Sequence, residues 1–320
     1  MYPIRIPPLQ FAPQRQPPSA RIDEYGHRDD HVHVGYDAIL CRPLRPMPYA
    51  ADPYVLVDTR HGTMLANRFD EYVGQALIQY GEYAELETQL LLQCIDRPGT
   101  VVEVGANIGS QTVPLAKAAK AAGAGVMAFE PQPFVFQNLC ANLALNATDN
   151  VVAWPFACAA HEGTVWFPSP DYRRAGNFGA VSARTQPLDN SIEVPCIRLD
   201  DMTRGQTVHL LKVDVEGFEL QVLQGAEGIL AKHRPLLYVE NDRVAHSPTL
   251  IEYLWGHDYR LWWHISPLFN PQNFRANTEN RYPQVCSFNM LGVPRESSLV
   301  LRDFEEIVDA TAHPLARPEP

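Results

Sequence analysis

The stretch that decides the fold runs Thr100-Val-Val-Glu-Val-Gly-Ala-Asn-Ile-Gly-Ser110. It begins with β-branched apolar residues, which is typical of a buried strand. It ends with Gly105 and Gly109, which would lie in a strand-to-helix turn. Glycine lets a backbone approach a ligand closely, because it has no Cβ. The pattern G-x-N-x-G differs from the G-x-G-x-x-G of dinucleotide-binding folds, and alone it also fits a tight turn that binds nothing.

Two acidic residues near this turn indicate which kind of ligand it could bind. Glu103 precedes Gly105 by two positions. A carboxylate there favours a cationic ligand such as S-adenosylmethionine over the pyrophosphate of NAD, which favours an open helix N-terminus. Glu130 ends the next predicted strand, where a carboxylate can accept both hydrogen bonds of a ribose diol. The alternative for Glu130 is an acid that stabilises the dipole of the following helix.

Strand and helix patterns alternate on both sides of this stretch. The alternation predicts a parallel sheet with helices on both faces and a ligand at the carboxyl ends of its strands. We expect helices over residues 84–96, 110–122, 131–146, 217–232 and 249–256. We expect strands over residues 54–58, 64–66, 100–104, 125–129, 151–157, 164–167, 208–215 and 236–240, and two closing, antiparallel strands over 259–265 and 285–293.

The distribution of prolines suggests how the chain is divided. Ten of the 28 prolines fall in residues 1–53, which predicts a Pro-rich N-terminal extension. Residues 54–83 form a small β and lead-in element, residues 84–295 the main domain, and residues 296–320 a C-terminal tail.

Composition narrows the classes of protein. The 320 residues carry a formal net charge of -11, which argues against a nucleic-acid partner because such binding needs a cationic face. No apolar run is long enough to span a bilayer, and the first residues lack the apolar region of a secretory signal. The six scattered cysteines include no C-x-x-C pair, so a structural zinc site is not expected. We therefore expect a cytoplasmic protein without a membrane span.

Several motifs together resemble one family. Residues 101–109 (VVEVGANIG), 128–131 (AFEP) and 210–219 (LLKVDVEGFE) are similar to the motifs of the FkbM family of S-adenosylmethionine-dependent methyltransferases, and residues 80–87 resemble the family's acidic lead-in helix. The similarity spans about residues 72–295, with Glu103 standing where many members have aspartate. It implies an α/β class I methyltransferase (Rossmann-like) fold with a seven-stranded, mostly parallel sheet and helices on both faces. The implied activity is O-methyl transfer to a hydroxyl of a sugar, glycan or secondary metabolite.

The resemblance and the strand ends together assign a cofactor site for S-adenosylmethionine. The predicted cofactor-binding residues are Glu82, Glu103, Gly105, Ala106, Asn107, Gly109, Ser110, Glu130 and Pro131.

Three residues at the ends of later strands are candidates for catalysis. Asp214, Glu240 and His264 are expected to converge on the acceptor hydroxyl, with one acting as general base. The same three would equally suit a divalent cation. Asp214 could instead cap a helix, and His264 could be a structural imidazole beside two tryptophans.

Polar and aromatic residues in the later part of the chain are candidates for binding the acceptor, although turn-forming asparagines and core packing explain them nearly as well. They are Asn177, Asn241, Trp263, Asn270 and Asn273.

Two other functions compete with methyl transfer. A nucleotide-dependent oxidoreductase could use the same sheet, but Asn107 and the missing third glycine speak against it. A non-catalytic adenosyl-binding module could recruit partners through the Pro-rich extension, but the acids after several strands disfavour it.

Overall fold

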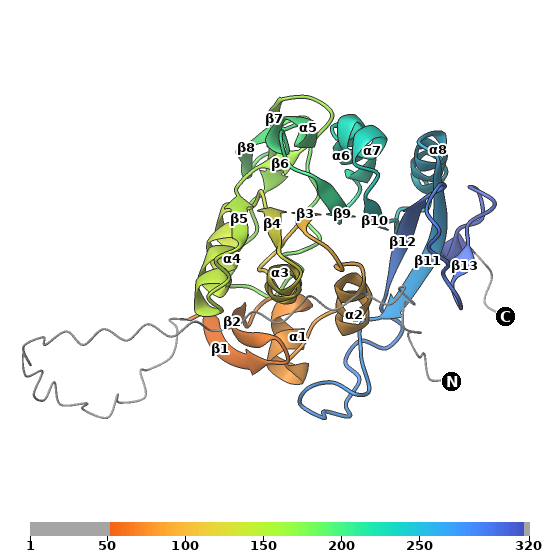
Figure 1. The fold of residues 1–320 in the computed structure, drawn as a ribbon. Coiled ribbons are helices and arrows are strands. Elements are labelled where there is room, and N and C mark those ends of the chain that lie inside the picture. The colour runs from red at the N-terminus through yellow and green to blue at the C-terminus, as the bar shows by residue number, and fades with distance from the viewer. Residues whose placement is uncertain (1–51, 317–320) are drawn as a thin grey trace, which may run out of the picture.

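The computed structural model describes residues 52–316, and its centre is one twisted sheet (Figure 1). The order of the strands is β13-β11-β12-β10-β9-β3-β4-β5. Neighbours from β5 to β10 are parallel, whereas β12 is antiparallel to both β10 and β11. A mostly parallel sheet was predicted and is confirmed, but it has eight strands rather than seven, because the short β13 is added at the edge beside β11. The bounds are β3 (Gly99–Val104), β4 (Ala124–Phe129), β5 (Val151–Trp154), β9 (Val208–Val213), β10 (Leu236–Glu240), β11 (Tyr259–Pro267), β12 (Cys286–Pro294) and the short edge strand β13 (Glu305–Glu306).

Helices cover both faces of this sheet (Figure 1). Side chains alternate along each strand, so Val101 packs with α2 and α3, while Val102 packs with α6, α7 and α8. The bounds are α2 (Glu85–Gln93), α3 (Thr112–Ala121), α4 (Pro133–Leu145), α5 (Leu199–Met202), α6 (Glu219–Gln224), α7 (Glu227–Lys232) and α8 (Ser247–Gly256). No helix within residues 52–316 is long and apolar enough to cross a membrane.

An N-terminal hairpin packs on the helical layer below the glycine turn. It consists of β1 (Tyr54–Thr59) and β2 (Gly62–Asn67), and α1 (Val73–Tyr80) follows. The buried side chain of Asn142 in α4 joins the hairpin to the turn: its Oδ1 accepts from the Leu65 N–H at 2.6 Å, and its Nδ2 donates to the Ile108 carbonyl at 2.7 Å. The hairpin therefore supports the turn directly.

A second sheet lies beside β5 and carries a segment that reaches the site. Its order is β6-β8-β7, with β6 (Ala157–Cys158), β7 (Gly163–Pro168) and β8 (Ser191–Ile197). At the other end of the chain, residues 299–313 pack along the main sheet, where Leu301, Ile307 and His313 are buried. The 3-10 turn η1 (Pro314–Ala316) ends the described chain.

The structure differs from the predicted elements in several places. The strand expected over residues 151–157 is the two strands β5 and β6, and the segment expected to be a C-terminal tail contributes β13 to the main sheet. The single helix expected over residues 217–232 is two short helices, because Asp200 accepts the N–H groups of Gly228 at 2.9 Å and Ile229 at 3.0 Å and so caps the second piece. Helix α1 and strand β8 were not predicted. The Pro-rich extension lies outside the described residues, except for positions 52 and 53.

Candidate functional site

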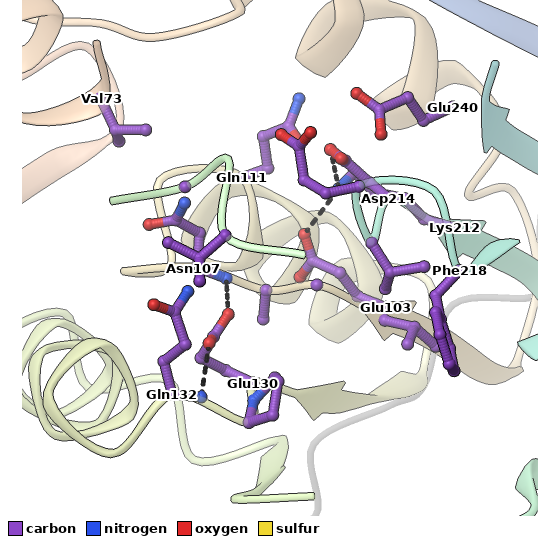
Figure 2. Close-up of a pocket in the computed structure, with 18 of the residues that line it drawn as sticks. Val73, Glu103, Asn107, Gln111, Glu130, Gln132, Lys212, Asp214, Phe218 and Glu240 are labelled. Atoms are coloured by element: carbon purple, nitrogen blue, oxygen red, sulfur yellow. Dashed lines mark hydrogen bonds and ion pairs between the residues drawn. The ribbon is translucent and has the colours of Figure 1, made fainter. Parts of the chain in front are cut away.

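A deep cavity opens at the carboxyl ends of β3, β4, β9 and β10 (Figure 2). The predicted cofactor residues that line it are Glu103, Gly105, Ala106, Asn107, Ser110, Glu130 and Pro131, and two predicted catalytic residues, Asp214 and Glu240, line it as well. The expectation that polar strand ends meet at one edge of the sheet therefore holds for most of the predicted residues.

The glycine turn holds two strands together at the floor of the cavity. Gly105 has a φ of +86°, and a Cβ at this position would lie 1.8 Å from the carbonyl oxygen of Asp214. Any larger residue would therefore push the end of β3 away from the end of β9. Gly109 is not among the lining residues; its φ is +85°, and a Cβ there would lie 2.8 Å from Leu139 of α4. Gly109 thus serves the packing of the turn.

A buried lysine joins two of the acidic side chains. Lys212 Nζ lies 3.1 Å from Asp214 Oδ2 and 3.7 Å from Glu103 Oε1 (Figure 2). The Lys212 and Glu103 side chains are 2% and 1% exposed. Burial raises the pKa of Glu103, which the Lys212 charge opposes, and the neighbouring carboxylates raise the pKa of Lys212 despite its burial. The second oxygen of Glu103, Oε2, has no hydrogen-bond partner within 3.5 Å in the described chain, and the nearby Thr112 hydroxyl lowers the pKa of Glu103.

Glu130 is held in place by backbone groups. Its Oε2 accepts from the Asn107 N–H at 3.0 Å and its Oε1 from the Gln132 N–H at 2.9 Å (Figure 2). Burial raises the pKa of Glu130 to about 7, even though these two hydrogen bonds lower it. The carboxylate is thus fixed beside the turn, with lone pairs left for further donors.

The far end of the cavity is acidic. Carboxylate oxygens of Glu216, Glu240 and Asp242 lie within 4.8 Å of one another, and Asp214 is close by. Arg243 pairs with Glu216 at 2.6 Å. Burial first, and then the charges of Asp214 and Glu216, raise the pKa of Glu240 well above its usual range.

His264 does not join this acidic group, contrary to the predicted convergence. Its ring is buried and its Nδ1 lies 2.7 Å from the hydroxyl of Tyr238. Burial lowers the pKa of His264 to about 4, so the imidazole is neutral near pH 7. His264 belongs to a buried polar pair between strands. Among residues 52–316, the carboxylates that lie close enough together to hold a cation are those of Glu216, Glu240 and Asp242.

A strap of residues 171–183 crosses the cavity between β7 and β8. Gln132 Nε2 donates to the carbonyl of Phe178 at 3.1 Å, and Ser182 Oγ donates to the carbonyl of Glu216 at 2.7 Å. The strap thereby bonds to both sides of the cavity. Asn177, predicted to bind the acceptor, lines the cavity from this strap.

Other predicted residues lie elsewhere. Glu82 accepts hydrogen bonds from Arg60 Nε at 2.8 Å, Asn270 Nδ2 at 2.7 Å and the Phe274 N–H at 2.8 Å, so it anchors a loop rather than lining the cavity. Asn273 is buried in that same loop and donates to two of its carbonyls.

Two more predicted acceptor residues are structural by their contacts. Asn241 is buried and donates to Ser247 Oγ at 2.9 Å. Trp263 is 4% exposed and packs in the core against α8, with its ring edge-on to His313.

The sequence analysis assigned no role in the site to several of the lining residues. They include Glu87, Gln132, Phe156, Lys212, Phe218 and Asn289. Lys212 precedes Asp214 by two positions, so its side chain points to the same face of the sheet, and this could have been predicted from the sequence. Asn289 is recognisable only once β12 is paired with β10, because it lies opposite Glu240.

Comparisons with known proteins agree with this geometry. Residues 103–261 match the family model described as the methyltransferase FkbM domain. The chain is 28% identical over 194 residues to the methyltransferase sdnD of Sordaria araneosa, covering 51% of this chain and 74% of the relative. It is 29% identical over 146 residues to the hexuronic acid methyltransferase AglP of Haloferax volcanii, covering 44% of this chain and 56% of that relative.

Two solved structures align with part of this chain. The crystal structure of methyltransferase FkbM from Methylobacillus flagellatus KT aligns with a TM-score of 0.43 and 18% identity, over 61% of this chain and 43% of that chain. The crystal structure of M. jannaschii TYW2 in complex with AdoMet aligns with a TM-score of 0.42 and 16% identity, over 81% of this chain and 89% of that chain.

Proposed function

Because the chain belongs to the FkbM methyltransferase family, we propose that it transfers a methyl group from S-adenosylmethionine to a hydroxyl oxygen of a sugar, glycan or secondary metabolite. One observation carries the proposal: Glu103 and Glu130 line the same cavity as Asp214 and Glu240, so a cofactor end and an acidic acceptor end adjoin. The names of the two relatives, one of them a hexuronic acid methyltransferase, agree with it.

The residues at the cofactor end fit S-adenosylmethionine. The unpartnered Oε2 of Glu103 could accept from the ammonium group of a bound ligand. Glu130 could accept from ribose hydroxyls, since its carboxylate is already oriented by two backbone N–H groups. Apolar side chains suited to an adenine ring line the neighbouring wall, among them Phe156 and Phe218.

The chemistry that this chain would add is orientation and proton removal. When bound, S-adenosylmethionine supplies an electrophilic methyl group on a sulfonium. The chain would hold the acceptor oxygen in line with that group, which supplies much of the acceleration in displacements of this kind. Asp214 or Glu240 would receive the hydroxyl proton, because an aliphatic hydroxyl is a poor nucleophile until its proton is removed.

A small or glycan acceptor suits the charge of the site better than a polynucleotide. The formal net charge is -11, and four carboxylates gather at the acceptor end. Phosphate groups would meet repulsion there.

Two measurements test the proposal. Calorimetry with S-adenosylhomocysteine should show binding, and Glu130→Ala should weaken it about 10-fold, the loss expected for hydrogen bonds to a charged group. Formation of S-adenosylhomocysteine should then be followed with a panel of methyl glycosides, hexuronic acids and hydroxylated polyketides. Wild-type affinity in Glu130→Ala would contradict the ribose assignment. Absence of binding and turnover in the wild-type protein would refute the proposed function.

A further inference from the structure

Two buried polar atoms in the cavity lack partners. Glu240 Oε2 and Asn289 Nδ2 are both shielded from solvent, and neither has a hydrogen-bond partner within 3.5 Å in the described chain. The side chain nearest to bonding Asn289 is Tyr238, whose hydroxyl is already bonded to His264. Asn289 as a whole is only 2% exposed. Leaving such a group unsatisfied costs about 1–3 kcal/mol, so a pair of them in one cavity indicates a ligand that would satisfy both.

The two side chains are neighbours across the sheet. Glu240 in β10 and Asn289 in β12 are directly opposed in the antiparallel ladder. Directly opposed residues project from the same face, with Cβ atoms about 5 Å apart. Both residues also line the cavity at its acidic end. One is an acceptor and the other a donor, so the pair has the polarity of a site for a single hydroxyl group.

We propose that Glu240 and Asn289 bind the acceptor hydroxyl, with Asn289 Nδ2 donating to its oxygen and Glu240 Oε2 taking its proton. This inference rests on the proposed function and makes it more specific. It assigns the general base to Glu240 rather than to Asp214, and it adds a binding residue that the sequence analysis did not contain.

The surroundings distinguish Glu240 from Asp214 as the base. Asp214 is paired with Lys212 at 3.1 Å, so one of its oxygens is already engaged by a cation. Glu240 faces the carboxylates of Asp214, Glu216, Glu219 and Asp242. The nearby cations are already engaged, Lys212 by Asp214 and Glu103, and Arg243 by Glu216 and Asp242. Glu240 is in none of these ion pairs, and its Oε2 is free to take a proton from the acceptor.

The pair also selects oxygen over other ligands. A hydroxyl oxygen has two lone pairs, so it can accept from Asn289 and still attack with the other. A neutral amine has one lone pair and could not do both. A divalent cation would satisfy Glu240 but would leave the Asn289 N–H without an acceptor. The geometry therefore points to an alcohol as the nucleophile.

The step balances as follows. The hydroxyl oxygen forms a bond to the methyl carbon, the bond between that carbon and the sulfonium sulfur breaks with its electron pair going to sulfur, and the proton moves to Glu240. Asn289 stabilises the negative charge that develops on oxygen before the bond is complete. Donors placed in this way contribute about 100-fold or more to turnover.

The test compares variants on the panel acceptor that the wild-type protein methylates fastest. Asn289→Leu should lower kcat/KM about 100-fold. Glu240→Gln should lower kcat about 100-fold or more and remove the acidic limb of the pH–rate profile. Both should bind S-adenosylhomocysteine within about twofold of wild type, because no residue of the cofactor end is changed. Asn150→Ala serves as the control: it removes an asparagine outside the cavity whose amide donates to the Ala116 carbonyl at 2.9 Å, so it should lower stability without changing kcat.

Several outcomes would overturn the inference. Asn289→Leu with kcat/KM within threefold of wild type would show that its amide does not contact the acceptor. An unchanged acidic limb in Glu240→Gln would assign the base elsewhere. Inactivation by EDTA, reversed by Mn²⁺ and accompanied by Mn²⁺ binding that Glu240→Gln abolishes, would make Glu240 a metal ligand instead. A wild-type protein that methylates nothing refutes the proposed function itself, and this is seen before any variant is made.

Discussion

Replacing Lys212 with methionine tests how the acidic floor of the cavity is stabilised. The substitution keeps most of the side-chain volume and removes the charge 3.1 Å from Asp214 and 3.7 Å from Glu103. The loss of this charge affects the two carboxylates differently, because the Asp214 side chain is 34% exposed and the Glu103 side chain only 1%. Water can solvate Asp214, whereas Glu103 is left as an uncompensated buried charge. Breaking a buried pair in this way costs about 3–5 kcal/mol.

The pH dependence of this loss has a definite sign. Burial already raises the pKa of Glu103 from 4.5, and Lys212 opposes that rise. Without Lys212 the folded-state pKa goes higher still, so the folded protein binds a proton that the unfolded chain has released above pH 4.5. The destabilisation should therefore be fully present at pH 8 and should shrink towards about 1–2 kcal/mol at pH 5.

Urea unfolding at both pH values measures this, and a double variant sharpens it. Lys212→Met combined with Glu103→Gln removes both members of the pair, so it should be more stable than Lys212→Met alone by about 2 kcal/mol at pH 8. Equal losses at pH 5 and pH 8, together with additive effects of the two substitutions, would refute the idea that Lys212 compensates Glu103.

Three further predictions concern other parts of the site. Gly105→Ala should destabilise the protein by more than about 2 kcal/mol and weaken binding of S-adenosylhomocysteine, because its Cβ would lie 1.8 Å from the Asp214 carbonyl; an unchanged urea midpoint would contradict this. Binding of S-adenosylhomocysteine should release a fraction of a proton near pH 6.5, because ribose hydroxyls would favour the ionised form of Glu130, whose pKa is about 7. Calorimetry in buffers of different ionisation enthalpy measures this proton release, and proton uptake would contradict the prediction. Glu82→Gln should lower stability by about 1–3 kcal/mol yet leave that affinity within twofold; a 10-fold loss of affinity would restore Glu82 to the cofactor site.

The sequence predicted the fold well, because the fold depends on local periodicity. Apolar runs such as 100–104 and 208–213 mark buried parallel strands, and the residues after them must meet at one edge. Glu130, Asp214 and Glu240 were assigned from this rule and Glu103 from its place before the glycine turn, with the family resemblance in support, and all four line the cavity. The helix over residues 217–232 was placed correctly in the chain but not divided, since its break depends on a cap from Asp200.

The remaining part of the site depends on pairing between distant segments. His264 was expected at the end of a strand, but β11 continues to Pro267, and the His264 ring is bonded to Tyr238 and does not reach the cavity. Asn289 reaches the cavity because β12 runs antiparallel between β10 and β11. The register of that pairing cannot be predicted from the sequence of either strand. Glu82 resembled a cofactor ligand by family position, yet its partners are Arg60 and Asn270, 22 and 188 positions away along the chain.

The contacts of Asn142 indicate that the hairpin β1–β2 evolves together with the region that matches the family. The family match starts at residue 103, after the hairpin β1–β2. Yet one amide side chain binds the backbone of that hairpin and the backbone of the glycine turn, through Leu65 and Ile108. An insertion or a shift of register in β2 would be transmitted directly to the cofactor end of the cavity. Substitutions in residues 62–67 and in the turn at 105–109 should therefore be correlated among related sequences, although the family match begins only at residue 103.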